Sequence, residues 1–341
     1  MKMKYSLLFF CLLAFSYTAF AQEEEEEEIP DGWRVGAGIG LDLAQLLQIN
    51  PKQGAGQNRL GLGTAVNGFG KYKMGRRTWD NTLLWQFGVQ RLGSGVIAQG
   101  STDKIPFQKN IDELRIGSKY GYQIKEEGNL YYSANFTFLS QLLPTYQFPD
   151  RYPGNFISDW LDTGRTPLSK LLAPATTTFS IGIDYQPKPE VSIFFSPISS
   201  KFIIVANDSI ASRGVHGNQV SGEPNDRGIY PEYEKIDAQI GALAQVKYET
   251  SFLTDDRGTF STSLGLYSNY LRNPENVDVD WQNGLSFAFT ENLHLSLFLN
   301  LFYDDDIRVQ ITDYNAPNGV AGLGRRVSVT EQLLITYART F

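Results

Sequence analysis

KIDAQIGALAQVKYE, residues 235–249, decides the fold because it alternates apolar and polar side chains almost without a break. One parity carries Ile236, Ile240 and Val246, and the other carries mainly charged and amide side chains. A period of two is the periodicity of a β-strand, in which successive side chains point to opposite faces. The run is longer than the usual soluble strand of about five or six residues and is long enough for a membrane strand of about 9–11.

The same alternation recurs along the chain, for example in NLHLSLFLNLFYD (292–304), TTFSIGIDYQ (177–186) and WDNTLLWQFGVQ (79–90). Twelve strands are predicted, near 32–49, 58–73, 77–91, 110–125, 129–147, 175–187, 190–206, 233–250, 257–271, 277–290, 292–304 and 326–341. After the N-terminal segment no stretch approaches about 18 consecutive apolar residues, so helical membrane spans are not expected.

The connections between these strands alternate in length. KMGRR, EEGN, PKP, LTDDRG and EN are tight turns. The connections between them are mostly much longer: INPKQGAGQ, 92–109, 148–174, 207–232, 272–276 and 305–325. Short turns at one end and long loops at the other are typical of outer-membrane barrels. A closed barrel also pairs every backbone polar group, as hydrocarbon requires. We therefore predict an all-β fold, a transmembrane antiparallel β-barrel of the bacterial outer membrane with about twelve strands and both termini periplasmic.

The two ends of the chain agree with export and membrane assembly. Residues 1–21 have the charged, apolar and small-residue regions of a signal peptide, and they contain Cys11, the single cysteine. Residues 22–31 include six consecutive glutamates and are expected to be a disordered leader, which leaves 32–341 as one barrel domain. Phe341, at the end of LLITYARTF, is the expected signal for the barrel-assembly machinery.

The charge balance argues against a nucleic-acid partner. Removal of Lys2 and Lys4 leaves 28 basic and 37 acidic residues, a formal charge of −9. No basic stripe is present. The expected surroundings are outer-membrane lipid.

From Trp33 onward the chain resembles a family of outer-membrane β-barrels of Bacteroidota bacteria, known as domain of unknown function 3078. The likeness is carried by TWDNTLLWQFG, ELRIGSKYGYQ and LLAPATTTFSIGIDYQPKPEVSIFFSPISSKFIIVAND, and it continues into SIASRGVHGN. The early strand is looser, because Asn50-Pro51 replaces a turn that contains tryptophan in the family. The resemblance implies a location and a fold, and no activity.

The polar parity is expected to face the lumen. The candidate lumen-facing polar residues are Arg34, Arg59, Arg115, Lys119, Asp184, Lys235, Asp237, Lys247, Glu249 and His294. Both charge signs are interspersed, so no selectivity ring of a single sign is predicted. The width of a twelve-stranded lumen lies between that of an eight-stranded barrel, which side chains fill, and that of a 16-stranded porin, which holds an aqueous channel. The strand number is therefore compatible with a thin pore and also with a plugged barrel. The 148–174 loop is a candidate plug or lid.

No catalytic, metal or cofactor site is predicted. His294 and Ser296 share a strand face, but that face is the lumen parity near a short turn, which does not suit a lipid hydrolase. His216 lies alone in a glycine-flanked loop, so no zinc site is expected. Asp304, Asp305 and Asp306 lack the pattern of a calcium loop, and they are interpreted as a solvated loop start. GAGIG (36–40) lacks the helix that a phosphate-binding glycine motif needs.

Three functions follow from this pattern. The favoured one is a narrow porin-like channel for small polar solutes. The first alternative is a non-transporting scaffold or accessory subunit of a surface or secretion complex. The second alternative, a barrel enzyme acting on lipid, depends on His294 and Ser296 alone.

Overall fold

The computed structural model describes residues 31–50, 59–90, 108–147, 155–156, 167–313, 315 and 320–340. Within these residues, twelve long strands form a closed antiparallel barrel, in which each strand pairs with the next and the last pairs with the first. They are β1 (Gly32–Ile49), β2 (Arg59–Met74), β3 (Arg77–Gln90), β4 (Gln108–Gln123), β5 (Leu130–Ser140), β9 (Ala175–Lys188), β10 (Val191–Ile204), β13 (Ile236–Phe252), β14 (Gly258–Asn269), β15 (Val277–Ala288), β16 (Leu293–Tyr303) and β19 (Ser328–Thr340). The predicted twelve-stranded barrel is confirmed.

The register of the strands pairs apolar residues with apolar residues on neighbouring strands around the barrel. Leu41 on β1 is opposite Tyr337 on β19, and Ile39 is opposite Val66 on β2. Since directly opposed residues project to the same side of a sheet, each apolar parity continues into the next strand. The sheet therefore closes with one apolar surface and one polar surface.

Burial in this barrel is inverted relative to a soluble protein. Many large apolar side chains are exposed, for example Val35, Ile181 and Ile198, whereas Ser180, Asp184 and Ser196 are fully buried. A soluble sheet buries its apolar face and exposes the polar one. The apolar parity therefore faces outward and the polar parity faces an enclosed interior, as expected for a membrane barrel.

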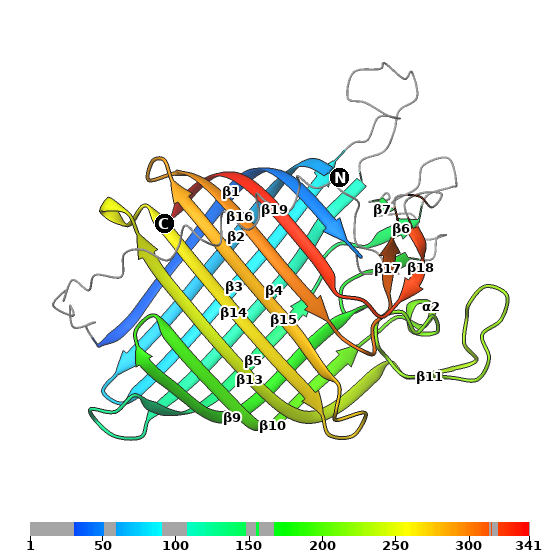
Figure 1. Cartoon of the computed structure of the whole chain (residues 1–341), viewed down its shortest axis with the longest axis horizontal. Helices are drawn as coiled ribbons and strands as arrows, with labels where there is room; N and C mark the ends of the chain where they lie inside the picture. Colours follow the sequence, from blue (N-terminus) through cyan, green and yellow to red (C-terminus); the bar gives the residue numbers. More distant parts are fainter. Residues whose placement is uncertain are drawn as a thin grey trace, which may run out of the picture. The chain divides into compact units, whose positions relative to one another are not determined.

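The two ends of the barrel differ. One end, the short-turn end, carries the tight connections and the described chain ends; in the two-residue turn between β2 and β3, Gly75 has φ +51°. The other end, the long-loop end, carries β6 (Thr145–Gln147), β7 (Asn155–Phe156), β8 (Pro167–Ser169), α2 (Asp208–Ala211), β11 (Val220–Ser221), β12 (Glu232–Tyr233), β17 (Val309–Thr312) and β18 (Val320–Gly324). In Figure 1 these small elements gather at one end of the tilted strands. No helix among the described residues is long and apolar enough to cross a membrane.

Two predicted strands differ in detail from the observed ones. The stretch 129–147 divides, because β5 leaves the barrel wall at Ser140 and β6 begins only at Thr145. The second difference is a bulge in β10, where the register shifts between Ser196 and Ser199 against β13 and between Phe195 and Ile198 against β9. Pro197 lies inside this bulge, one of the few places where a sheet accepts proline.

The predicted signal peptide, the acidic leader up to residue 30 and Phe341 lie outside the described residues. Most of the 148–174 loop also lies outside them, so its role as a plug stays a prediction. Its last part, residues 167–174, is described at the long-loop end.

Candidate functional site

The bulge in β10 decides which of its side chains enter the lumen. Before it, Phe194 and Ser196 are buried and Phe195 is exposed; after it, Ser199 is buried and Ile198 is exposed. The inward parity changes from even to odd because one extra residue reverses the alternation. As a result, Lys201 points into the lumen.

A buried ion pair joins two strands near the short-turn end. Asp184 on β9 is completely buried, and its carboxylate lies 2.6 Å from the ammonium of Lys119 on β4. Ser192 and Gln186 donate further hydrogen bonds to the same carboxylate. These contacts compensate for much of the cost of removing both charges from water.

Other charges at the same level are solvated. Lys71, Asp80, Lys247 and Glu249 lie on the lumen parity of their strands, and each is exposed. Lys247 on β13 interacts electrostatically with Asp80 on β3, five strands away around the ring of twelve. We call this part of the lumen, at the short-turn end, the vestibule.

The middle of the lumen carries charged side chains on more than one strand. Arg115 on β4 is held by Glu113, with 2.9 Å between the guanidinium and the carboxylate. Arg115 also interacts electrostatically with Asp280 on β15, six strands away and hence on the opposite wall. A solute that passes this level meets a guanidinium on one side and a carboxylate on the other.

At the long-loop end a lysine bridges several strands. The ammonium of Lys201 lies 3.0 Å from Asp278 on β15 and 3.1 Å from Asp304, just after β16. To reach them it passes the inner faces of β13 and β14, and it lies 5.3 Å from the centre of the Tyr267 ring. Asp304 is buried and Lys201 is half-buried, so this contact, the Lys201 bridge, is part of the structure of the lumen.

The acidic triplet 304–306 is divided among three cations. Asp304 pairs with Lys201, Asp305 lies 3.5 Å from Arg325, and Asp306 lies 3.8 Å from Arg272. The interpretation of these residues as a solvated loop start is wrong for Asp304, which is 4% exposed. No group of three potential metal ligands occurs among the described residues.

Arg272 links the last long loop to the barrel. Its guanidinium bonds the carboxylate of Asp237, which also accepts hydrogen bonds from Gln219 and Gln239. Asp237 is 3% exposed, so these donors replace the water that the carboxylate has lost. Together with the Lys201 bridge, this contact joins strands and loops at the long-loop end by ion pairs.

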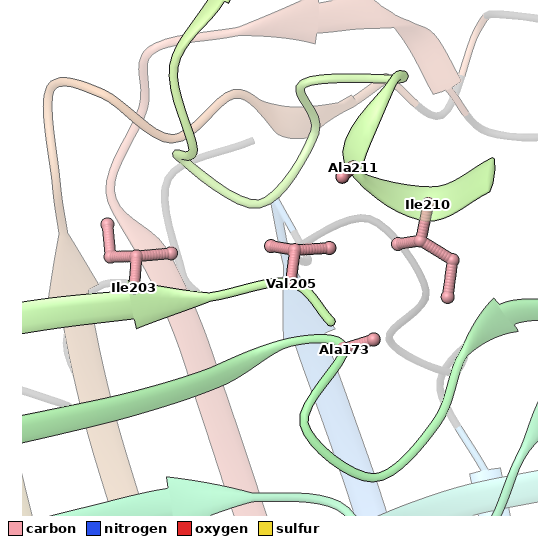
Figure 2. Close-up of a cluster of buried hydrophobic side chains, with 5 residues drawn as sticks. All are labelled: Ala173, Ile203, Val205, Ile210 and Ala211. Carbon is pink, nitrogen blue, oxygen red and sulfur yellow. The ribbon is translucent and has the colours of Figure 1, made fainter. Parts of the chain in front are cut away.

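A small apolar cluster fixes the loops at this end. Figure 2 shows Ile203 and Val205 at the end of β10, beside Ile210 and Ala211 of α2 and Ala173 of the preceding loop. These side chains are buried, and Tyr233 packs against them. Asn207 caps α2 by accepting a hydrogen bond from the Ile210 amide. The long loop 205–235 is thus docked on the barrel.

A second contact holds the segment after β5. The buried carboxylate of Asp112 accepts hydrogen bonds from the Leu142 and Leu143 amides and from the Trp85 indole, and it pairs with Lys109 at 2.9 Å. These bonds account for the end of β5 at Ser140, because the chain turns to satisfy Asp112. Asp112 belongs to the outward parity, and the turned segment covers it.

The remaining predicted residues lie in different settings. Lys235 precedes β13, and its ammonium pairs with Asp208 of α2 at 2.7 Å, so it belongs to the long-loop end. Arg34 is exposed on β1 near the short-turn end, and Arg59 begins β2. His294 approaches the Glu291 carbonyl, while Ser296 shares a hydrogen bond with Ser286. The serine therefore has a hydroxyl as its hydrogen-bond partner, and the imidazole contacts a backbone carbonyl instead of the serine.

Three of the lumen groups were missed by sequence reasoning. The inward direction of Lys201 can be predicted only if the bulge in β10 is predicted first. Pro197, within an otherwise apolar strand, was the sequence signal for that bulge. Asp278 and Asp280 alternate with Val277, Val279 and Trp281, so their parity was readable from the sequence. Their partners on distant strands were not.

The comparisons with known proteins are limited in extent. A family model described as a protein of unknown function (DUF3078) matches residues 48–146, less than a third of the chain. No curated protein matches the chain.

Solved structures match this chain with low sequence identity and low TM-scores. The translocator domain of the autotransporter NalP from Neisseria meningitidis is 10% identical, with 91% of this chain and 90% of that chain covered and a TM-score of 0.36. The COG4313 outer membrane channel from Pseudomonas putida F1 is 12% identical, with 93% and 100% covered and a TM-score of 0.35. An anion-selective porin from Comamonas acidovorans is 9% identical, with 90% and 99% covered and a TM-score of 0.31. At such scores the fold assignment depends on the strand pairing of this chain itself.

Proposed function

We propose that this protein is an integral barrel of the outer membrane and acts as a narrow channel for small polar solutes. The observation that carries the proposal is the facing of Arg115 and Asp280 across a polar lumen. Charged side chains on opposite walls suit the passage of hydrated polar species. The short-turn end would face the periplasm, and the long-loop end would face outward.

The outer surface supports insertion into lipid. Its polar side chains satisfy one another, as in the pair formed by Thr262 with Asn283, whose amide also donates to the Leu299 carbonyl. Near the short-turn end Trp33 packs against Tyr72 and Trp79, with ring centres 5.2 and 5.6 Å apart. Aromatic girdles at the edge of an apolar band mark the interface of membrane barrels.

Planar-bilayer recording tests the channel directly. We expect the purified, folded protein to produce discrete current steps, and Arg115→Met to shift the reversal potential in a salt gradient toward greater cation selectivity, because Glu113 and Asp280 then lack their cation. Lys188→Met, at the exposed end of β9, is the matched control and should leave the reversal potential unchanged. Silence of folded wild-type protein at all voltages would refute the proposal.

A second function is favoured by the docked loops at the long-loop end. The apolar cluster around Ile203 and Ile210, together with the Lys201 bridge, builds an ordered platform on the barrel. A scaffold or accessory subunit of a surface or secretion complex would use such a platform. Native purification from membranes tests this: recovery of a stable partner that is lost on deletion of residues 222–231 supports a scaffold, and recovery of the protein alone argues against it.

A further inference from the structure

The Lys201 bridge has the composition of a ligand site that is occupied by the protein's own side chain. An ammonium lies between two carboxylates, Asp278 and Asp304, at 3.0 and 3.1 Å. Both contacts are direct and charge-assisted, the arrangement in which an ammonium binds most strongly. Any ammonium of similar size can satisfy the same two carboxylates.

Two buried polar groups beside the bridge lack partners. The hydroxyl of Tyr267 and the side-chain nitrogen of Asn269 have no hydrogen-bond partner within the described residues, and their side chains are only 6% and 8% exposed. The orientation of the Asn269 amide is fixed, because its oxygen accepts a hydrogen bond from the Leu271 amide. Both groups therefore have a donor hydrogen unused, and buried donors are rarely left without an acceptor.

These donors lie on the lumen side of the same strand, two residues apart. The Tyr267 ring is under the ammonium of Lys201, and Asn269 lines a cavity of about 10 Å³ together with Asp278, Arg272 and Asp306. A cavity of this size holds about one water molecule. A larger ligand that places its own ammonium on Asp278, which lines this cavity, has to displace Lys201 from that carboxylate.

We propose that the outer end of the lumen binds small zwitterionic solutes, whose ammonium replaces that of Lys201 on Asp278 and Asp304. The carboxylate of the solute then pairs with the released Lys201 and accepts hydrogen bonds from Tyr267 and Asn269. Binding and opening are thereby coupled, since the bridge must break for the solute to enter. The inference rests on the proposed channel function and assigns its substrate class, the free amino acids and compounds of similar charge.

Glycine is the probe, because it has both charges and almost no side chain. Single-channel open probability is measured in planar bilayers with glycine, with methylammonium alone and with glycolate alone, at equal concentration and ionic strength. We expect glycine to raise the open probability of the wild type by roughly tenfold, the effect of removing about 1.4 kcal/mol from the closed state. Each single ion should give a much smaller change.

Lys201→Met should be open without glycine and insensitive to it, while Lys201→Arg restores a closed state. Lys235→Met removes an exposed lysine at the same end and should keep the glycine response. Because Lys201→Met leaves the buried carboxylate of Asp304 and the half-buried one of Asp278 without this cation, its folding is checked by resistance to proteolysis. If it does not fold, Asp278→Asn replaces it, with loss of glycine binding in isothermal titration as the readout.

The outcomes separate the two proposals. If wild type and variants are all silent, the channel itself is refuted. If they conduct but glycine and Lys201→Met change nothing, the zwitterion site is wrong and the channel stands. If methylammonium alone opens the wild type as well as glycine does, the site recognises cations and the zwitterion assignment is overturned.

Discussion

At the scale of single residues, the pair of Asp184 and Lys119 is the strongest test of the lumen contacts. We expect Asp184→Asn to lower the free energy of unfolding by about 2–3 kcal/mol, because the half-buried ammonium of Lys119 then lacks its carboxylate. Unfolding by urea in phospholipid vesicles measures this loss.

Glu249→Gln is the matched control for that change. Glu249 faces the vestibule and is exposed to water, so its neutralisation should change stability by less than about 1 kcal/mol. Equal losses for the two variants would contradict the distinction between a buried pair and solvated vestibule charges.

His216 makes the docked loop sensitive to acid. Burial lowers the pKa of His216 to about 4, although the Leu168 backbone contact partly opposes the shift. Since the unfolded imidazole has its ordinary pKa of about 6.5, the undocked loop binds the proton more readily. Docking is therefore fully stable above about pH 6.5 and weakens as the pH falls toward 4.

Limited proteolysis of residues 205–235 between pH 7 and pH 4 measures this effect. We expect cleavage to increase on acidification in the wild type and to depend much less on pH in His216→Gln, which has no titrating imidazole. A protease that is equally active over this range, or a correction with an unfolded substrate, is required. Identical pH profiles for the two proteins would refute the role of His216.

At the scale of elements, the bulge in β10 requires a glycine on the neighbouring strand. A Cβ on Gly182 would lie 2.0 Å from the carbonyl oxygen of Phe195, a contact that only backbone movement can relieve. Gly182→Ala should therefore reduce the yield of folded protein severely. Gly265→Ala is the control, because its Cβ would meet nothing closer than the Asp280 carbonyl oxygen at 3.6 Å.

Refolding into detergent micelles, followed by resistance to proteolysis, compares these two lumen-facing glycines. A folded yield for Gly182→Ala equal to that for Gly265→Ala would mean that the bulge adapts freely. The parity of Lys201, and with it the bridge, would then be less tightly determined than the close contact indicates.

The strands could be predicted from the sequence because alternation is a local signal. In 235–249 each side chain reports its own face, and the burial of Asp237 and Gln239 beside exposed Ile236 and Ile240 follows that pattern. The Lys201 bridge could not be predicted, since it joins residues more than seventy positions apart and depends on one extra residue at Pro197. The division of Asp304, Asp305 and Asp306 among three cations likewise depends on where separate loops meet.

At the scale of the whole molecule, the apolar exterior and polar interior predict that the barrel is surrounded by lipid. Leu293 and Leu299 are both outward residues of β16 with similar exposure, 36% and 40%. Leu293 begins the strand at the short-turn end, and Leu299 lies near its middle. In water the two positions would be equivalent, whereas in a bilayer they differ in depth.

Arginine at the two positions therefore distinguishes a bilayer from water. We expect Leu299→Arg to lower the free energy of unfolding in vesicles by about 2–4 kcal/mol and Leu293→Arg by about 0–1 kcal/mol, because the cost of a charge rises toward the midplane. Urea unfolding in phosphatidylcholine vesicles measures both. Equal costs would mean that the two leucines lie in the same environment, which contradicts a bilayer. Release of the protein from cells by washing without detergent would also contradict insertion in a membrane.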